Sequence, residues 1–391
     1  MGVPKSQGRS RDMQSFIPLL GGLLVVSCAV AGEAPGQSST TASQPTAEGA
    51  TGSPSEIARL DALLDQSYTW GDHLVEKGEF GEAERFSVEL IGLLVSRYGE
   101  GNWRIRTAKV LQASFRRMAQ LQPAEQERLR RALATLQLGS QRADESRPVE
   151  ASRLLKKAKN ALDELLGPSD IHATGATLRY AGTLADLGDF EQAKQLKQDV
   201  IKIRQELTGE LSLHYADAAR GLGEVYSRTG MLEAAEAQLR LADRIYLQLY
   251  DGETVQARAI GLVHLVAVLV EARKFDEAEP LARESARFAA MTMAETPQLH
   301  IQARINLAKC LQGQKKAAEA ADELTGIMKL VDGPKTSPAY LVDLITRYVA
   351  VLDEAGRGKE AARYRERLTE LERQIERAQR QSDEELPALP E

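Results

Sequence analysis

The hexapeptide Gly188-Asp189-Phe190-Glu191-Gln192-Ala193 decides the fold, because related segments return along the chain at a nearly constant interval. The related segments are Gly230-Met231-Leu232-Glu233-Ala234-Ala235, Arg273-Lys274-Phe275-Asp276-Glu277-Ala278, Lys315-Lys316-Ala317-Ala318-Glu319-Ala320 and Arg357-Gly358-Lys359-Glu360-Ala361. Their last alanines are separated by 42, 43, 42 and 41 residues. Self-similarity at a fixed period of this length indicates an array of stacked repeats.

Two more copies lie upstream, which makes seven visible copies. The same interval before Ala193 leads to Ala151, and a well-formed copy ends at Ala83. Ala83 and Ala151 are 68 residues apart, which is not a multiple of the period. We therefore predict an additional helix, at about residues 103–121, that ends at Gln122-Pro123 because a proline interrupts a helix.

Each copy has the pattern of two antiparallel helices. After the break at Thr229-Gly230, apolar residues step by three and four positions, as on one face of a helix. These apolar positions are Leu232, Ala235, Leu239, Ala242, Tyr246 and Leu249. Small residues such as Gly223 and Ala235 allow two helix backbones to approach closely. Since one hairpin leaves an apolar face exposed, the pattern predicts an all-α, right-handed superhelical solenoid of stacked antiparallel helical hairpins.

Composition agrees with helices and excludes several classes of function. Aromatic residues are 5% of the chain, and helix-forming Ala, Leu, Glu, Arg and Gln dominate from about Ser55 onward. The net charge of −6 is spread along the chain without a Lys/Arg-rich run in the repeats, so we expect no nucleic-acid partner. The two cysteines, Cys28 and Cys310, lie in contexts too different for a disulfide framework or a thiolate metal site.

The N-terminus has the pattern of an export signal. Basic residues precede the apolar run 16–26, which is too short to span a bilayer. The segment Leu24-Val25-Val26-Ser27-Cys28 resembles a bacterial lipobox, in which the cysteine is lipidated, whereas Ala29-Val30-Ala31 fits ordinary signal cleavage. We favour lipidation of Cys28, because it directly follows the apolar run. A soluble periplasmic or secreted protein, cleaved at Ala31, is the alternative.

The chain is expected to divide into six parts. Residues 29–55 are rich in Gly, Ala, Ser, Thr, Pro and Gln and cannot bury enough apolar surface to fold, so they form a tether. The predicted parts are the signal peptide with its lipobox (1–28), the disordered tether (29–55), a first helical hairpin (56–100), the extra helix and junction (101–131), about six 42-residue repeats (132–373), and a C-terminal helix end with an acidic tail (374–391).

The residues Leu222, Gly223 and Tyr226, followed by Ala235 and Leu239, resemble the tetratricopeptide repeat. The long period, and the segments Glu277-Ala278-Glu279-Pro280-Leu281 and Leu207-Thr208-Gly209-Glu210, are similar to its kinesin-light-chain-like subtype, here in a bacterial exported or lipoprotein context. The resemblance implies a scaffold that binds another protein or a peptide in a concave groove. It also implies a groove asparagine just before the repeat's first-helix leucine, and Asn306 is the residue that matches.

No catalytic constellation is visible in the sequence. The five histidines, His73, His172, His214, His264 and His300, are scattered without metal-ligand spacing. The phosphate-binding loop, the dinucleotide-binding glycine motif and the nucleophile elbow are also missing. We therefore predict no enzyme, no catalytic residue, no cofactor and no metal, with the membrane reached only through the N-terminal lipid.

The expected groove is lined by first-helix residues that do not point into the hairpin seam. These residues are Arg179, Asp217, Arg220, Glu224, His264, Gln302, Asn306, Lys309 and Arg347. Two functions remain open: an adaptor, tethered at the bacterial cell envelope, that holds a partner in this mixed-charge groove, or a structural component of a larger envelope assembly in which the groove has no role.

The lipid anchor can be tested at Cys28. Cys28→Ala should release the protein from membranes and abolish metabolic labelling with a palmitate analogue, because the thiol is the predicted acceptor of the lipid. Membrane fractionation and labelling measure both effects. A mature N-terminus that begins at Gly32 in the wild type would instead establish ordinary signal cleavage.

Overall fold

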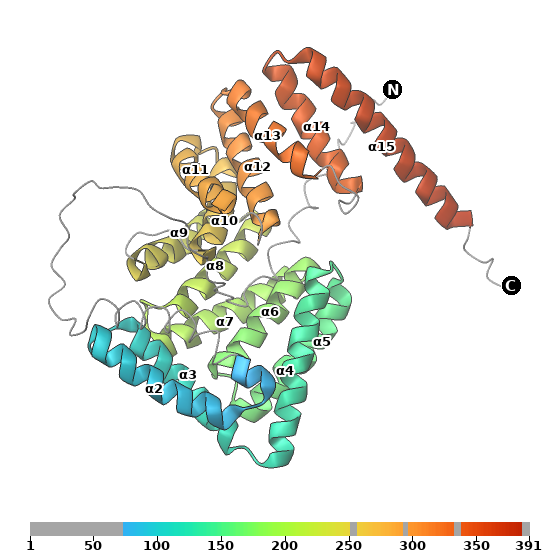
Figure 1. The fold of residues 1–391 in the computed structure, drawn as a ribbon. Helices are drawn as coiled ribbons and strands as arrows, with labels where there is room; N and C mark the ends of the chain where they lie inside the picture. The colour runs from blue at the N-terminus through green and yellow to red at the C-terminus, as the bar shows by residue number, and fades with distance from the viewer. Residues whose placement is uncertain (1–72, 251–255, 292–295, 332–337, 385–391) are drawn as a thin grey trace, which may run out of the picture. The chain divides into compact units, whose positions relative to one another are not determined.

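The computed structural model describes residues 73–250, 256–291, 296–331 and 338–384 (Figure 1). These residues form helices joined by short turns, and no residue in these ranges belongs to a β-strand. The predicted all-α fold of repeated helical hairpins is confirmed. Cys28, the signal peptide and the tether lie outside the described residues.

The chain forms two compact units, unit 1 up to Leu207 and unit 2 from Thr208 onward. Unit 1 contains α2 (Phe80–Tyr98), α3 (Trp103–Gln120), α4 (Pro123–Asp144), α5 (Pro148–Leu166), α6 (Ile171–Asp186) and, except for its last residue, α7 (Phe190–Thr208). In this unit α2 packs against α3, and α4 packs against α5 (Figure 1). Their shared core contains the buried side chains of Phe80, Phe115 and Leu129.

Helix α3 occupies the place where the sequence predicts an additional helix between two copies of the repeat. It contacts α4, α5 and α6 as well as α2. Helix α4 begins directly after it at Pro123, and the backbone N–H of Gln122 donates to Glu125 Oε2 at 3.0 Å. The expected start of the repeats at residue 132 thus falls inside α4, because the proline opens the helix at its first turn.

Unit 2 is a series of helical hairpins around one continuous core. Its helices are α8 (Leu213–Arg228), α9 (Leu232–Leu249), α10 (Gln256–Glu271), α11 (Phe275–Met291), α12 (Pro297–Gly313), α13 (Ala317–Val331), α14 (Pro338–Glu354) and α15 (Gly358–Glu384). Each helix packs against the next, and α10 also contacts both α8 and α12. We call the even-numbered helices from α4 onward first helices, and their odd-numbered partners second helices. Leu262, Val266 and Leu269 of α10 are completely buried, so α10 is the centre of this packing.

Every copy of the repeat turns at a residue with a left-handed backbone conformation. These residues are Gly78, Ser146, Gly188, Gly230, Arg273, Lys315 and Gly356. In the turn after α8, the Gly230 N–H donates to the Ser227 carbonyl at 3.0 Å and the Met231 N–H donates to the Tyr226 carbonyl at 2.9 Å. This pair of hydrogen bonds is the Schellman motif, which satisfies the last carbonyls of a helix and reverses the chain.

The two helices of a hairpin cross closely at a small residue, as the sequence predicted. A Cβ atom on Gly223 would lie 2.7 Å from Leu239 Cγ and 3.2 Å from the Ala235 carbonyl oxygen. Ala235 is itself completely buried. A larger side chain at either position would push α8 and α9 apart.

Ion pairs connect successive second helices at equivalent positions. Lys274 Nζ lies 2.8 Å from Glu236, which α9 carries, and Lys316 Nζ lies 2.8 Å from Glu279, which α11 carries. Hydrogen bonds from Lys316 and Arg283 lower the pKa of Glu279 to about 2. Glu279 therefore remains charged at neutral pH, and the repeated pairs favour one register between neighbouring hairpins, although each exposed pair adds little stability.

The role of the turn residues can be tested by replacing a turn glycine with alanine and a non-glycine turn residue with glycine. Gly230→Ala should lower the free energy of unfolding by about 1 kcal/mol, because a Cβ is unfavourable at this positive φ angle although the space around it is open. Lys315→Gly should raise the free energy of unfolding by up to about 1 kcal/mol, because Lys315 adopts the same unfavourable positive φ angle in the wild type. Urea denaturation measures both. The control is Gly182→Ala, a helical glycine with open space around it, which should stabilise the protein. Destabilisation by Lys315→Gly would contradict the role of the turn.

Candidate functional site

Arg179 is a half-buried residue of α6 that connects two first helices of unit 1. Its Nη1 atom donates to Ser140 Oγ of α4 at 3.1 Å. It also lies near Asp144, whose pKa is raised by burial while the charge of Arg179 opposes the rise. The structure therefore gives Arg179 a packing role between α4 and α6 and leaves only part of its surface accessible.

Arg220 is buried, with 8% of its surface exposed, instead of facing an open groove. Its Nε atom lies 3.9 Å from Asp217 Oδ1, which accepts a hydrogen bond of 2.6 Å from the Tyr246 hydroxyl. Burial lowers the pKa of Arg220, but the neighbouring Tyr246, Asp217 and half-buried Glu224 outweigh it and raise that pKa. A Cβ atom on Gly261 of α10 would lie 3.6 Å from Arg220 Cδ, an ordinary van der Waals distance, so α10 packs directly against the arginine side chain.

His264 and Asn306 are also interior residues of unit 2, with 4% and 1% of their surface exposed. Asn306 Nδ2 donates to the Val263 carbonyl of α10 at 2.8 Å, and Asn306 Oδ1 accepts from Gln302 at 3.1 Å. The sequence predicts an Asn306 side chain that is open to a bound peptide, whereas the observed side chain is buried within unit 2. Its amide binds a backbone carbonyl, but that carbonyl belongs to the neighbouring first helix.

Lys309 and Arg347 remain accessible and lie on adjacent first helices. Lys309 of α12 is half-buried, and 36% of the Arg347 side chain of α14 is exposed. Burial lowers the pKa of Lys309, and the charge of Arg347 lowers it further, while Asp343 and Glu271 raise it without reversing the shift. Charged residues of α10 and α14 thus act electrostatically on Lys309 of α12, and we call these four residues the Lys309 site.

The Lys309 site contains two cations, Lys309 and Arg347, and two carboxylates, Asp343 and Glu271. Arg347 is 3.8 Å from Asp343 Oδ2, longer than a direct hydrogen bond, and 52% of the Asp343 side chain is exposed. A carboxylate from another molecule would stabilise the ammonium group that burial and Arg347 disfavour. Arginine adds a planar fork that suits two hydrogen bonds to one carboxylate.

The described residues also bear on metal binding, thiol reactivity and membrane crossing. No group of three or more His, Cys, Asp or Glu side chains there could hold a metal ion. Cys310 donates to the Phe275 carbonyl at 3.2 Å, and burial raises the pKa of its thiol to about 11. Such a thiol is protonated at neutral pH and has a packing role. None of the described helices combines the length and apolar character required to cross a membrane.

A family model for the tetratricopeptide repeat matches residues 173–248. This segment begins within α6 and ends within α9, so it covers two successive hairpins and includes Gly188 and Gly230 at their turns. Over these residues the chain is therefore similar to the tetratricopeptide repeat, a helical repeat found in proteins that bind other proteins or peptides. No curated protein matches the chain in sequence.

Several solved structures are similar to part of this chain. A kinesin light chain from Podosopora anserina with nearly identical TPR-like repeats is 16% identical, with 52% of this chain and 98% of that chain covered and a TM-score of 0.42. BtubC (BKLC) from P. vanneervenii is 18% identical, with 69% and 96% covered and a TM-score of 0.45. The apo form of RapI is 14% identical, with 77% and 97% covered and a TM-score of 0.46.

The burial of Arg220 predicts a difference between two arginines that look alike in sequence. Arg220→Ala should lower the free energy of unfolding by about 3 kcal/mol, because it removes the cation beside the largely buried Asp217. Arg347→Ala should change it by less than about 0.5 kcal/mol, because Arg347 is partly exposed and its ion pair is loose. Equal midpoints of urea denaturation for the two variants would show that Arg220 does not stabilise the interior.

Proposed function

We propose that this protein is a non-catalytic adaptor, tethered to the bacterial envelope through Cys28, that holds an acidic segment of a partner protein on the first helices of unit 2. The observation that carries the proposal is the Lys309 site, where a half-buried ammonium group lies beside a second cation from the adjacent helix. Repeats of this class bind proteins, and the charge of this site indicates what kind of segment fits.

The site has a defined preference because it contains both signs of charge. Lys309 and Arg347 attract a carboxylate, while Asp343 and the exposed Glu271 repel one that is displaced along the face. Mixed charge of this kind contributes to specificity and register more than to affinity. We therefore expect an acidic residue of the partner at Lys309, with polar or basic residues beside it.

The position of Lys309 also suggests why the fold retains it. A half-buried cation with a lowered pKa destabilises the folded chain unless a partner compensates it. Lys309→Met keeps the length of the side chain and removes the charge, so it should leave the melting temperature unchanged or raise it. Partner binding should weaken, which is the usual exchange between stability and function at a binding site.

The test is recovery of the partner from envelope extract by wild-type protein, Lys309→Met and Lys309→Met/Arg347→Ala. Both variants should lose the partner that mass spectrometry identifies with the wild type, because each removes charge that holds the carboxylate. Lys329→Ala, a change of the same charge on the exposed surface of second helix α13, is the matched control and should retain it. Unchanged recovery by the double variant, together with oligomers that persist on cross-linking, would favour the structural role in a larger assembly.

Calorimetry with the identified partner gives a second measurement. The partner's carboxylate raises the pKa of Lys309 on binding. The affinity is therefore highest below the pKa that Lys309 has in the free protein. It falls as the pH rises from that value to the pKa that Lys309 has in the complex. Titrations in buffers of different ionisation enthalpy should show proton uptake as the pH approaches and exceeds the pKa of Lys309 in the free protein, and Lys309→Met should abolish it. Absence of proton uptake in the wild type would contradict contact with Lys309.

A further inference from the structure

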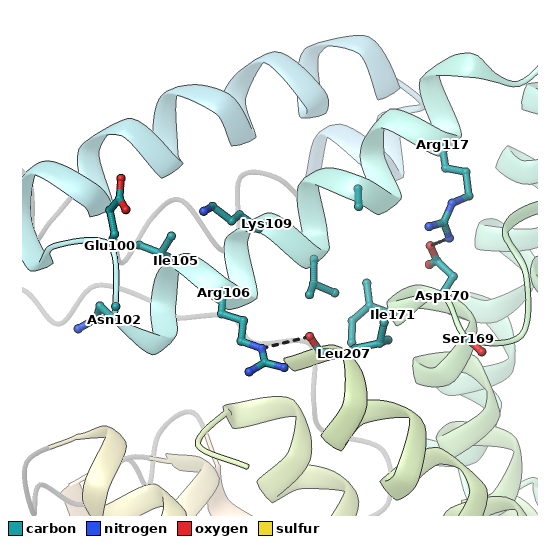
Figure 2. Close-up of a pocket in the computed structure, with 13 residues that line it drawn as sticks. Glu100, Asn102, Ile105, Arg106, Lys109, Arg117, Ser169, Asp170, Ile171 and Leu207 are labelled. Carbon is teal, nitrogen blue, oxygen red and sulfur yellow. Dashed lines mark hydrogen bonds and ion pairs between the residues drawn. The ribbon is translucent and has the colours of Figure 1, made fainter. Parts of the chain in front are cut away.

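Unit 1 contains a cavity of about 500 Å³ along one face of α3 (Figure 2). Ile105, Val110 and Ala113 of α3 line one wall, and Ile171 and Leu207 line the opposite wall. Helix α3 is the element that interrupts the regular repeat, and α2 packs against it elsewhere. The cavity therefore lies outside the first-helix face of unit 2 that carries the proposed function.

Two arginines on the rim are held in place by the opposite wall. Arg106 Nη2 donates to the Glu206 carbonyl at 3.2 Å, and its Nε donates to the Leu207 carbonyl at 3.4 Å, near the end of α7. This location is favourable for a cation, because the last carbonyls of a helix carry partial negative charge. Arg117 Nη1 lies 2.7 Å from Asp170 Oδ2 and donates to the Leu166 carbonyl at 2.9 Å.

Asp170 is buried beside Arg117, and its carboxylate offsets the charge of that arginine. Its side chain is 1% exposed, and it accepts hydrogen bonds from Ser114 Oγ at 2.8 Å and from the His172 N–H at 2.9 Å. The pKa of Asp170 is lowered. Burial alone would raise this pKa, but hydrogen bonds from His172 and Ser114 and the charge of His172 outweigh burial. The carboxylate is thus a fixed, buried anchor for Arg117.

Lys109 lies on the same face of α3, between the two arginines in sequence, and is exposed (Figure 2). Among the described residues it has no carboxylate within ion-pair distance, and Glu100 is the acidic residue that lines the cavity besides Asp170. The accessible rim is therefore positive, on a chain whose net charge is −6. A row of cations on α3 beside apolar side chains is complementary to a segment that alternates acidic and apolar side chains.

We propose that the α3 cavity binds an extended peptide segment of a partner protein, with apolar side chains on the floor and carboxylates at Arg106, Lys109 and Arg117. From Asn102 to Arg117 the lining face is about 22 Å long, at 1.5 Å per helical residue, which an extended strand covers with about seven residues. A small anion would leave the apolar floor exposed to water.

The probe is a fluorescein-labelled peptide of about seven alternating leucine and glutamate residues, whose anisotropy is measured with the full chain. Saturable binding that weakens with salt is expected, because the rim attracts carboxylates. Lys109→Glu should raise the Kd at least about tenfold, a loss of about 1.4 kcal/mol. Ala113→Phe should also weaken binding, because it fills the cavity without changing any charge. Thermal melting of both variants checks that they remain folded.

Three controls give the result its meaning. Lys157→Glu, the same charge change at an exposed position of α5 in unit 1, should leave the Kd unchanged. A peptide of alternating leucine and lysine should not bind. Lys309→Met should also have no effect, which separates this site from the Lys309 site of the proposed function. Failure of the acidic peptide to bind, equal binding by the Lys109→Glu variant, or loss of binding in Lys309→Met would overturn the proposal.

Discussion

The structure depends on one backbone constraint, a left-handed residue after each first helix. At seven places along the chain this conformation ends a helix, and in the turn after α8 the Met231 N–H bonds back to the Tyr226 carbonyl and reverses the chain. Because the reversal is tight, the second helix returns against the first, and a small residue such as Gly223 is required where they cross. Three copies accept the conformation without glycine, at Ser146, Arg273 and Lys315, which indicates that packing of the hairpins outweighs about 1 kcal/mol of backbone strain at each turn.

Close stacking of the first helices determines which polar residues remain available. α10 contacts both α8 and α12, and in that packing Arg220 is covered by α10 while Asn306 bonds to the Val263 carbonyl. These polar side chains act as links between helices, because a buried polar group requires a partner. Lys309 belongs to the same stack but keeps part of its surface accessible, so it carries the cost of partial burial without a complete set of partners.

The fold could be predicted from sequence because its determinants are local and periodic. The alanines return about every 42 residues, and the interval of 68 residues between Ala83 and Ala151 indicated the extra helix. The accessibility of single groove residues could not be predicted, because it depends on contacts between repeats. Nothing near Arg220 in sequence shows that α10 packs against it at Gly261, 41 residues later. The α3 cavity was missed for the same reason, since its walls come from α3, the start of α6 and the end of α7.

The distribution of ion pairs separates the surfaces that hold the repeats together from those that can bind a partner. Along the second helices, Glu236 and Glu279 each accept a lysine from the next hairpin, so these charges are already used within the fold. Lys109 and Lys309 differ, because among the described residues neither has a carboxylate within ion-pair distance. Lys109 lies where the extra helix interrupts the array, and Lys309 lies on α12, where charged residues of α10 and α14 act on it. A chain with an excess of acidic residues could have paired both lysines, and their unpaired state locates the two surfaces at which a partner's carboxylate would gain most.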